Sequence, residues 1–514
     1  MNDLYRINSI GWKVDPRKET TDKPPYGPRM LDLDVSVADE LMILLHNLPN
    51  AYIRDAMLPA LNENAYSHDS TWKSVSYDEL IKFLGLMLSM EVYVLPERHM
   101  YWFEKSFGVF PGLNFGKHMA KSRFEDIMRY LQLSSNPDPD DQIIDFVEAV
   151  NNRLQESFMA GDTVCLDESM IKAYHRNLKG KVKIIRKPRP IGNELKNMAD
   201  GRSKVVLKLE VMQGKEVNKN KEYNQEFGAT TGAVLRLTKG LRGTGRIVVA
   251  DSWFGSVKSA VELAKYGLYS IMLVKTAHKN FPMDKLNEAH LERGEWCTVN
   301  GITSEGIKLQ AVNFMDLQLK HFISTCSTDF PGEPRKTKHC GLITRPAVAV
   351  DYLKSAAAID IHNHVRTGSV GLEDAIKTKS PMVRQFTGVL GFLFTNAYLQ
   401  YTYFKSPMKH IDFKMNLANA MINFSVPMKL SHSCLLAKEL TSQHSVIKLA
   451  EKGVRSQKRC WYCKHGQRGV RKLTSYGCAK CGVPLCPPTA ELSCWDDHIN
   501  FGLPEKKDKR RQKK

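Results

Sequence analysis

The sequence predicts a mixed α/β or α+β protein with a small cysteine-rich module near its C-terminus. Helical spacing of apolar residues dominates up to about residue 155, and short apolar strands begin at Thr163. Two long helices are then predicted around Asp351–Val365 and Ser380–Phe404. Because strands and helices are mixed in the middle of the chain, we expect an α/β or α+β core.

The N-terminal part is predicted to be a helical domain over residues 31–155, preceded by a polar, Pro-rich arm over residues 1–30. Ser76 and Glu79 form a capping box ahead of apolar residues spaced three and four apart. The stretch Ser122–Leu133 repeats this spacing. Neither pattern carries chemistry, so we interpret both as packing helices.

The middle of the chain is predicted to contain strands that end at acidic residues. Thr163–Leu166 ends at Asp167-Glu168, and Arg246–Ala250 ends at Asp251. The other predicted elements are a helix over Trp253–Leu263 and strands at Lys204–Met212, Tyr269–Val274, Trp296–Val299, Lys308–Phe314 and Phe322–Thr325.

The composition is that of an ordinary globular protein of 514 residues, which at about 100–200 residues per domain allows roughly three to five structural units. Lys and Arg number 74 against 55 Asp and Glu, a formal charge of +19, so nucleic acid is the expected partner. Residues 452–514 carry 16 Lys and Arg against 5 Asp and Glu, a net charge of +11. They end in a basic tail over residues 501–514 that is typical of a nuclear-import signal or a phosphate-binding segment.

Membrane insertion and secretion are not expected. The first residues lack the apolar core of a signal peptide. Phe386–Phe404 is long enough to span a bilayer, but it contains Thr, Asn and Gln, so we favour a buried helix. In a reducing compartment, the crowding of six cysteines between Cys460 and Cys494 indicates metal binding rather than disulfides.

Asp167 and Asp251 are the first candidates for chemistry. Each follows a short apolar strand, and neighbouring strands would bring both carboxylates into one cleft. Like charges at close range raise one pKa, and a divalent cation removes that conflict. Asp360, in a predicted helix that follows small residues, is the candidate third acid. The alternative is that the two strand-end aspartates are ordinary turn or cap residues.

Four motifs in this order resemble the piggyBac-type DNA transposase family and its domesticated relatives. They are CLDESMIKAYHR (Cys165–Arg176), KPRPIGNELKNMADG (Lys187–Gly201), VVADSWFGS (Val248–Ser256) and AIDIHNH (Ala358–His364). The helical stretches at Ile81–Val92 and Ser122–Leu133 are also similar to that family.

This resemblance implies a ribonuclease H-like core in two parts, residues 156–265 and 346–430, interrupted by an insertion over residues 266–345. It implies a catalytic triad of Asp167, Asp251 and Asp360 that binds Mg²⁺ or Mn²⁺. It also implies cut-and-paste transposition into TTAA targets by a nuclear homodimer bound to double-stranded DNA. Asn363 stands where family members often have a further Asp, and Ala357-Ala358 replaces their Gly-Gly.

Basic and aromatic residues near the acids could contact DNA. We expect Lys187, Arg189, Lys196 and Arg202 near phosphates, or else on a solvated face. Trp253 and Phe254 could stack on an unpaired base or anchor the following helix to the core.

After a linker over residues 431–455, residues 456–500 are predicted to be a zinc-binding domain. Paired Cys-x2-Cys knuckles are a strong zinc signal, and seven ligands suggest two zinc ions in a cross-braced arrangement. The expected ligands are Cys460, Cys463, Cys478, Cys481, Cys486, Cys494 and His498, with His465 as a possible eighth. Basic residues of the intervening loop are expected to contact DNA: Arg468, Arg471 and Lys472.

Three functional hypotheses remain open at this point. The first is an active transposase, favoured because all three matched acids are present. The second is a domesticated, catalytically silent protein that binds DNA or chromatin. The third is a zinc-dependent interaction or ubiquitin-transfer module on an inert scaffold.

Overall fold

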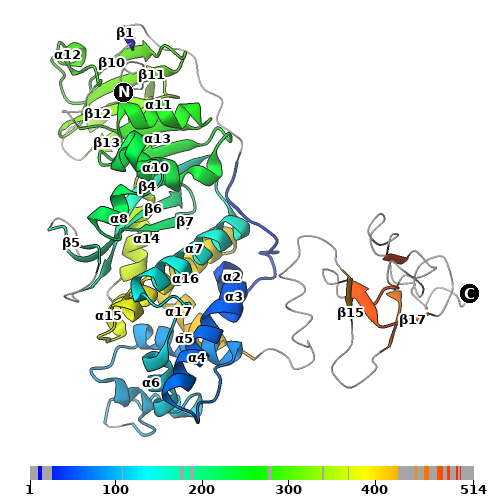
Figure 1. The fold of residues 1–514 in the computed structure, drawn as a ribbon. Helices are drawn as coiled ribbons and strands as arrows, with labels where there is room; N and C mark the ends of the chain where they lie inside the picture. The colour runs from blue at the N-terminus through cyan, green and yellow to red at the C-terminus, as the bar shows by residue number, and fades with distance from the viewer. Residues whose placement is uncertain are drawn as a thin grey trace, which may run out of the picture. The chain divides into compact units, whose positions relative to one another are not determined.

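The protein forms two compact units in a computed structural model, Met1–Phe424 and Ser425–Lys514, and each is described by itself (Figure 1). The structure describes residues 10–13, 26–106, 108–173, 179–185, 190–275, 280–337, 341–368, 370–425, 446–448, 457–461, 463, 472–478, 483–486, 494–495 and 498.

Ten strands of the described chain make one mixed sheet, in the order β1-β10-β11-β12-β9-β8-β4-β6-β5, with β7 paired to β6. Their bounds are β1 Gly11–Lys13, β4 Thr163–Lys172, β5 Lys181–Lys183, β6 Ile191–Asp200, β7 Val206–Val211, β8 Ile247–Ala250, β9 Tyr269–Leu273, β10 Trp296–Ile302, β11 Lys308–Met315 and β12 Leu319–Ser324.

The centre of this sheet has the ribonuclease H-like arrangement. Strands β4, β6 and β7 are antiparallel neighbours, whereas β8 pairs parallel to β4 and β9 pairs parallel to β8. Parallel strands are joined here by α11 (Val257–Lys265), the helix between β8 and β9. The predicted fold class is therefore confirmed.

The strands that follow the core extend the same sheet. β12 pairs with β9 and continues through β11 to β10 by antiparallel ladders. At the outer edge β10 pairs with β1, so part of the predicted loose arm is a strand. β2 (Arg29–Met30) likewise pairs with β3 (Phe158–Met159). A separate hairpin, β13 (Pro331–Thr337) and β14 (Gly341–Pro346), leads into α13 (Ala347–Ser355).

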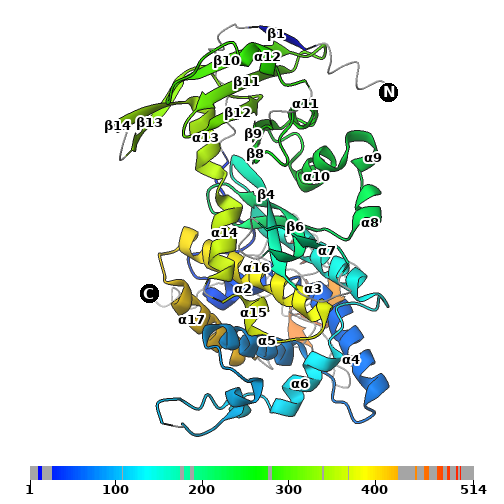
Figure 2. The ribbon, with the colours of Figure 1, turned by 90° about the vertical axis from the view of Figure 1, so that its left-hand side faces the viewer.

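Helices lie on both sides of the core strands. Figure 2 shows α13 (Ala347–Ser355) and α14 (Ala358–Thr367) on one side, and α10 (Ala229–Leu237) and α11 on the other. The predicted single helix Asp351–Val365 is thus wrong, because the helix is interrupted at Ala356-Ala357, between α13 and α14. The predicted helix at Trp253–Leu263 begins only at Val257, because Ser256 caps it by accepting a hydrogen bond from the Ser259 N–H.

The N-terminal helices belong to the same compact unit as the core. α2 (Glu40–Asn47) packs on α16 (Pro381–Phe404), and α5 (Tyr77–Val92) packs on α17 (His410–Ile422). The remaining main helices here are α4 (Leu58–His68), α6 (Lys121–Tyr130) and α7 (Pro139–Ser157). As predicted, Ser76 caps α5 by accepting from the Glu79 N–H.

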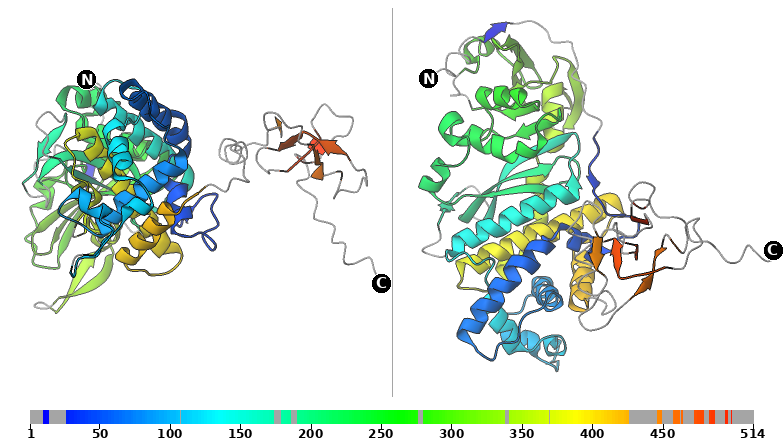
Figure 3. Two further views of the ribbon diagram at one scale, coloured as in Figure 1. Left: turned by 90° about the horizontal axis from the view of Figure 1, so that it is seen from below. Right: turned by 45° about the vertical axis from the view of Figure 1, so that its right-hand side comes forward.

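The apolar stretch Phe386–Phe404 is part of a buried core helix, as predicted. α16 runs beside α7 (Figure 3) and against β4, and most of its side chains are buried. Gly388 is required at its contact with β4, because a Cβ there would lie 2.6 Å from the side chain of Ile171. Within the described residues, none of the helices has the length and apolar character needed to span a membrane.

A fully buried histidine makes the stability of this core sensitive to acid. His362 on α14 stacks on Phe392 of α16, with ring centroids 5.2 Å apart, and its Nε2 lies 3.2 Å from the Asn396 carboxamide oxygen. Burial, reinforced by the charge of Arg366, lowers the pKa of His362 to about 3.

We therefore expect the free energy of unfolding to fall as pH drops below about 6.5. In that range His362 binds a proton in the unfolded chain but stays neutral in the folded protein. By pH 5 this single group costs about 2 kcal/mol. Urea unfolding at pH 7 and pH 5 measures the difference, which should shrink in His362→Phe and persist in the exposed control His68→Gln. An unchanged difference in His362→Phe would contradict the prediction.

Candidate active site and cysteine cluster

The register of two parallel strands brings Asp167 and Asp251 together. Leu166 of β4 pairs with Ala250 of β8, so the next residue on each strand is an aspartate at the same level of the sheet. β8 ends there, whereas β4 continues to Lys172, paired with β6. The predicted end of a strand at Leu166 is thus wrong, but the expected adjacency of the two acids is present.

The turn after β8 fixes the carboxylate of Asp251. Its Oδ1 accepts a hydrogen bond from the Trp253 N–H at 2.8 Å, and its backbone carbonyl accepts from the N–H groups of Phe254 and Gly255. Phe254 is fully buried, which supports its interpretation as an anchor, while Trp253 is half-buried.

Gly255 completes this turn at a place where no side chain fits. A Cβ on Gly255 would lie 1.8 Å from the backbone carbonyl oxygen of Leu273 on β9. We expect Gly255→Ala to lower the free energy of unfolding by about 3 kcal/mol, because backbone must move to relieve the overlap. Chemical denaturation measures this loss, and Gly27→Ala, where the added Cβ meets nothing within 4 Å, is the matched control. Equal stability of the two variants would contradict the prediction.

Asp360, on α14, lines the same cavity as Asp167 and Asp251. Cys165 of β4 donates its S–H to the carbonyl oxygen of Ala356 at 3.3 Å, which ties the α13–α14 junction to the sheet. The acids share an open cavity of about 410 Å³ lined by Asp167, Glu168, Asp251, Tyr352, Leu353, Ala356, Ala357 and Asp360.

Three of the carboxylates are close enough to share a cation. Oxygen atoms of Asp167, Glu168 and Asp251 lie within 4.8 Å of one another, while exposed Asp360 lines the cavity outside this close group. Burial and the charge of Glu168 raise the pKa of Asp251 against the opposing hydrogen bonds and Lys196. Carboxylates placed so closely match the oxygen ligands that Mg²⁺ and Mn²⁺ take in proteins.

Glu168 and Asn363 are two further residues close to the candidate acids in the chain. The sequence indicates Glu168 only as the neighbour of Asp167, whereas in the fold its carboxylate joins those of Asp167 and Asp251. Asn363 lies one turn after Asp360, and its buried carboxamide oxygen accepts no hydrogen bond from the part of the chain that the structure describes.

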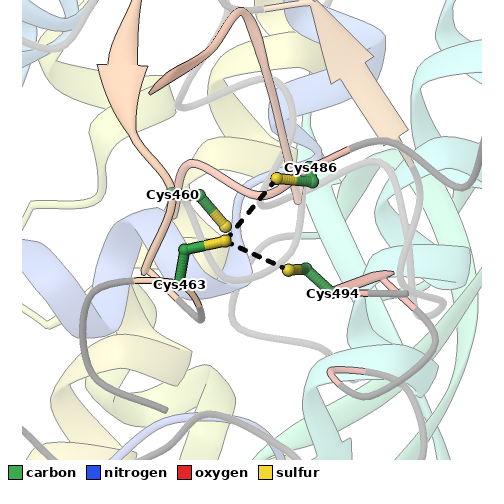
Figure 4. Close-up of side chains that lie close together, drawn as sticks. All are labelled: Cys460, Cys463, Cys486 and Cys494. Atoms are coloured by element: carbon green, nitrogen blue, oxygen red, sulfur yellow. Dashed lines mark hydrogen bonds between the residues drawn. The ribbon is translucent and has the colours of Figure 1, made fainter. Parts of the chain in front are cut away.

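The C-terminal unit contains a second candidate metal site, made of four thiols. The Sγ atoms of Cys460, Cys463, Cys486 and Cys494 lie within 4.8 Å of one another (Figure 4). Cys463 is 3.5 Å from Cys494 and 3.9 Å from Cys486, sulfur to sulfur. All four side chains are buried, and four sulfurs this close fit a tetrahedral Zn²⁺ site.

This grouping is interleaved along the chain. The first Cys-x2-Cys pair joins Cys486 and Cys494, whereas Cys478, the first cysteine of the second pair, is buried outside the group. That order is the one expected for a cross-braced module. His498 is also buried, while Cys481 and His465 lie outside the described residues.

Comparison with known proteins places the chain in a family. A family model described as "Transposase IS4" matches residues 43–398, more than half of the chain and including all three candidate acids. The chain belongs to this transposase family. The search of curated protein sequences finds no match.

The transposase also resembles a solved structure, a cryo-EM structure of the piggyBac transposase synaptic complex with hairpin DNA. The match has a TM-score of 0.63 at 16% sequence identity and covers 90% of this chain and 97% of the other. At this identity the similarity shows the fold. The resemblance to piggyBac-type transposases is thereby confirmed at the level of family and fold.

The predicted DNA-contacting residues of the transposase are in different surroundings. Arg202 is half-exposed and pairs with Asp162 at 2.5 Å. Lys196 is buried in β6 and is not part of a surface that DNA could contact. Lys472 is half-buried beside the cysteine cluster. The other predicted contacts lie outside the described residues: Lys187, Arg189, Arg468 and Arg471.

Proposed function

We propose that this protein is a cut-and-paste DNA transposase that cleaves and joins DNA strands with divalent cations held by Asp167, Asp251 and Asp360. One observation carries the proposal: residues from two neighbouring strands and a helix bring these acids, with Glu168, into a single open cavity. A cluster of negative charge is poorly suited to hold a phosphate by itself, which argues for cations as its natural ligands.

The residues of the cavity have separable roles. Bound Mg²⁺ or Mn²⁺ would polarise a phosphodiester and the attacking water or 3′-hydroxyl. Asp251 is held in place by its turn, Asp167 by the sheet, and Asp360 by α14. The open cavity gives a DNA strand access to all three.

The surroundings of Tyr352 and Cys165 disfavour a covalent protein intermediate at either residue. Tyr352 lines the cavity, and burial together with the nearby Cys165 and acids raises the pKa of its phenol. Burial and Asp167 likewise raise the pKa of the Cys165 thiol. Both groups stay protonated at neutral pH and are poor nucleophiles, which supports direct attack by water or a DNA hydroxyl.

The finer parts of the proposal concern partners. We propose that the substrate is double-stranded DNA with transposon ends and TTAA targets, and that a homodimer acts in the nucleus. The net charge of +19 and the basic C-terminal tail support nucleic acid binding and nuclear import. We also propose that the cysteine-rich unit binds Zn²⁺ and recognises DNA, supported by its four clustered thiols.

The direct test is cleavage of duplexes that carry the sequences flanking this coding region in its genome. The proposal expects nicking at the ends that requires Mg²⁺ or Mn²⁺ and is absent with Ca²⁺ or EDTA. The alternative, a domesticated DNA-binding protein, predicts salt-sensitive binding of the same duplexes without cleavage in any metal.

A further inference from the structure

A charged side chain sits in the interior beside the active site without lining its cavity. Lys196 of β6 is 1% exposed, and in the sheet it pairs with Glu168 of β4 on one side and Glu210 of β7 on the other. An ammonium in such a place is costly unless its charge is compensated.

The partners of Lys196 are one carboxylate and two aromatic rings. Its Nζ donates to Glu194 Oε1 at 2.8 Å and lies 3.4 Å from the centroid of the Trp253 ring and 5.4 Å from that of Phe254. A desolvated ammonium is attracted to the face of an indole ring by the ring quadrupole. The lysine therefore attracts the aromatic side chains that follow Asp251 in the chain.

These aromatic residues belong to the turn that fixes Asp251. Trp253 donates its backbone N–H to Asp251 Oδ1, and Phe254 donates to the backbone carbonyl of Asp251. A contact that holds the Trp253 ring thus also holds the hydrogen bond that aims the carboxylate. A hydrophobic side chain could fill the same volume but would not bind the ring electrostatically.

We propose that Lys196 is a positioning residue for the active site, which holds the Asp251 carboxylate in place for cation binding through its contact with Trp253. This inference rests on the proposed function. It assigns an internal, structural role to a lysine that the sequence alone places among DNA contacts. It requires the positive charge of Lys196 and the ring of Trp253 together.

Binding of Mn²⁺ to the full-length protein without DNA, followed by electron paramagnetic resonance, tests the inference independently of cleavage. We expect about tenfold weaker binding in Lys196→Met, even though the loss of a positive charge that acts on Asp251 by itself favours a bound cation. Binding should be near normal in Lys196→Arg, which keeps the charge. Lys208→Met is the control, because Lys208 on β7 is a half-buried lysine that donates to the Arg236 carbonyl instead.

A second variant keeps the test decisive where Lys196→Met folds poorly. Trp253→Leu should weaken Mn²⁺ binding to the same degree, and the double variant should be no worse than either single one, because both remove one contact. Wild-type affinity in folded Lys196→Met or Trp253→Leu would overturn the inference. If Asp251→Asn itself leaves Mn²⁺ binding unchanged, the proposed metal site fails instead.

Discussion

Asp251→Asn is expected to reduce metal-dependent DNA cleavage by a factor on the order of 10³ or more while leaving the fold intact. The amide keeps the shape of the side chain and can still accept the hydrogen bond from the Trp253 N–H. It removes a negative charge from a close group of three carboxylates that would hold the cation. Loss of several kcal/mol of transition-state stabilisation corresponds to this factor, at tenfold per 1.36 kcal/mol.

Single-turnover cleavage of end DNA in Mn²⁺ measures the effect, with thermal unfolding as the check on folding. Asp351→Asn is the matched control, because this acid on α13 pairs with Lys354 outside the lining of the cavity. Cleavage by Asp251→Asn at the control's rate would rule out the proposed role of the triad, whereas DNA binding should persist in both variants.

Cys463→Ser is expected to remove about one equivalent of zinc from the C-terminal unit. Without this zinc the unit should no longer fold stably. Cys463 has two neighbouring sulfurs within 3.9 Å, so its loss leaves the remaining three thiols without a complete tetrahedral set. Structural zinc contributes about 10–16 kcal/mol of apparent binding free energy in small modules, far more than so small a unit gains from its core.

Zinc content by mass spectrometry and limited proteolysis of the full-length protein measure these losses. Cys326→Ser, a half-buried thiol in the first unit, should keep its zinc and its protease resistance. If Cys463→Ser retains the zinc content of the control, the four-thiol site is not a zinc site. Binding of end DNA should weaken together with zinc loss if this unit recognises DNA.

The core strands were predictable where burial makes their sequences continuously apolar. β8 and β9 can be predicted from the sequence for this reason. Asp167 and Asp251 lie at the same level because β8 pairs parallel to β4. The sequence does not predict β6, because its buried residues include Asn193, Lys196 and Asn197. Local patterns cannot show that such polar residues have partners inside the protein.

The partners of those polar residues come from remote parts of the chain. Asn193 donates to Gln385 of α16, and Asn197 hydrogen bonds to Ser169 of β4. Lys196 is a further example. Its charge predicts a surface position, whereas in the fold its ammonium lies against the ring of Trp253, which comes from another part of the chain. Which cysteines group together is also a tertiary property, since spacing alone does not separate Cys478 from the cluster of four.

The hydrogen bonds between β9 and β12 have a mechanical consequence. Because the residues inserted after β9 continue the ladder of the core sheet, they cannot swing as a hinged lid without breaking main-chain pairing. A molecule bound by these strands would therefore keep a fixed position relative to the acids. Exchanging it for the corresponding segment of another transposase would succeed only where the graft preserves the register Phe322 to Leu273.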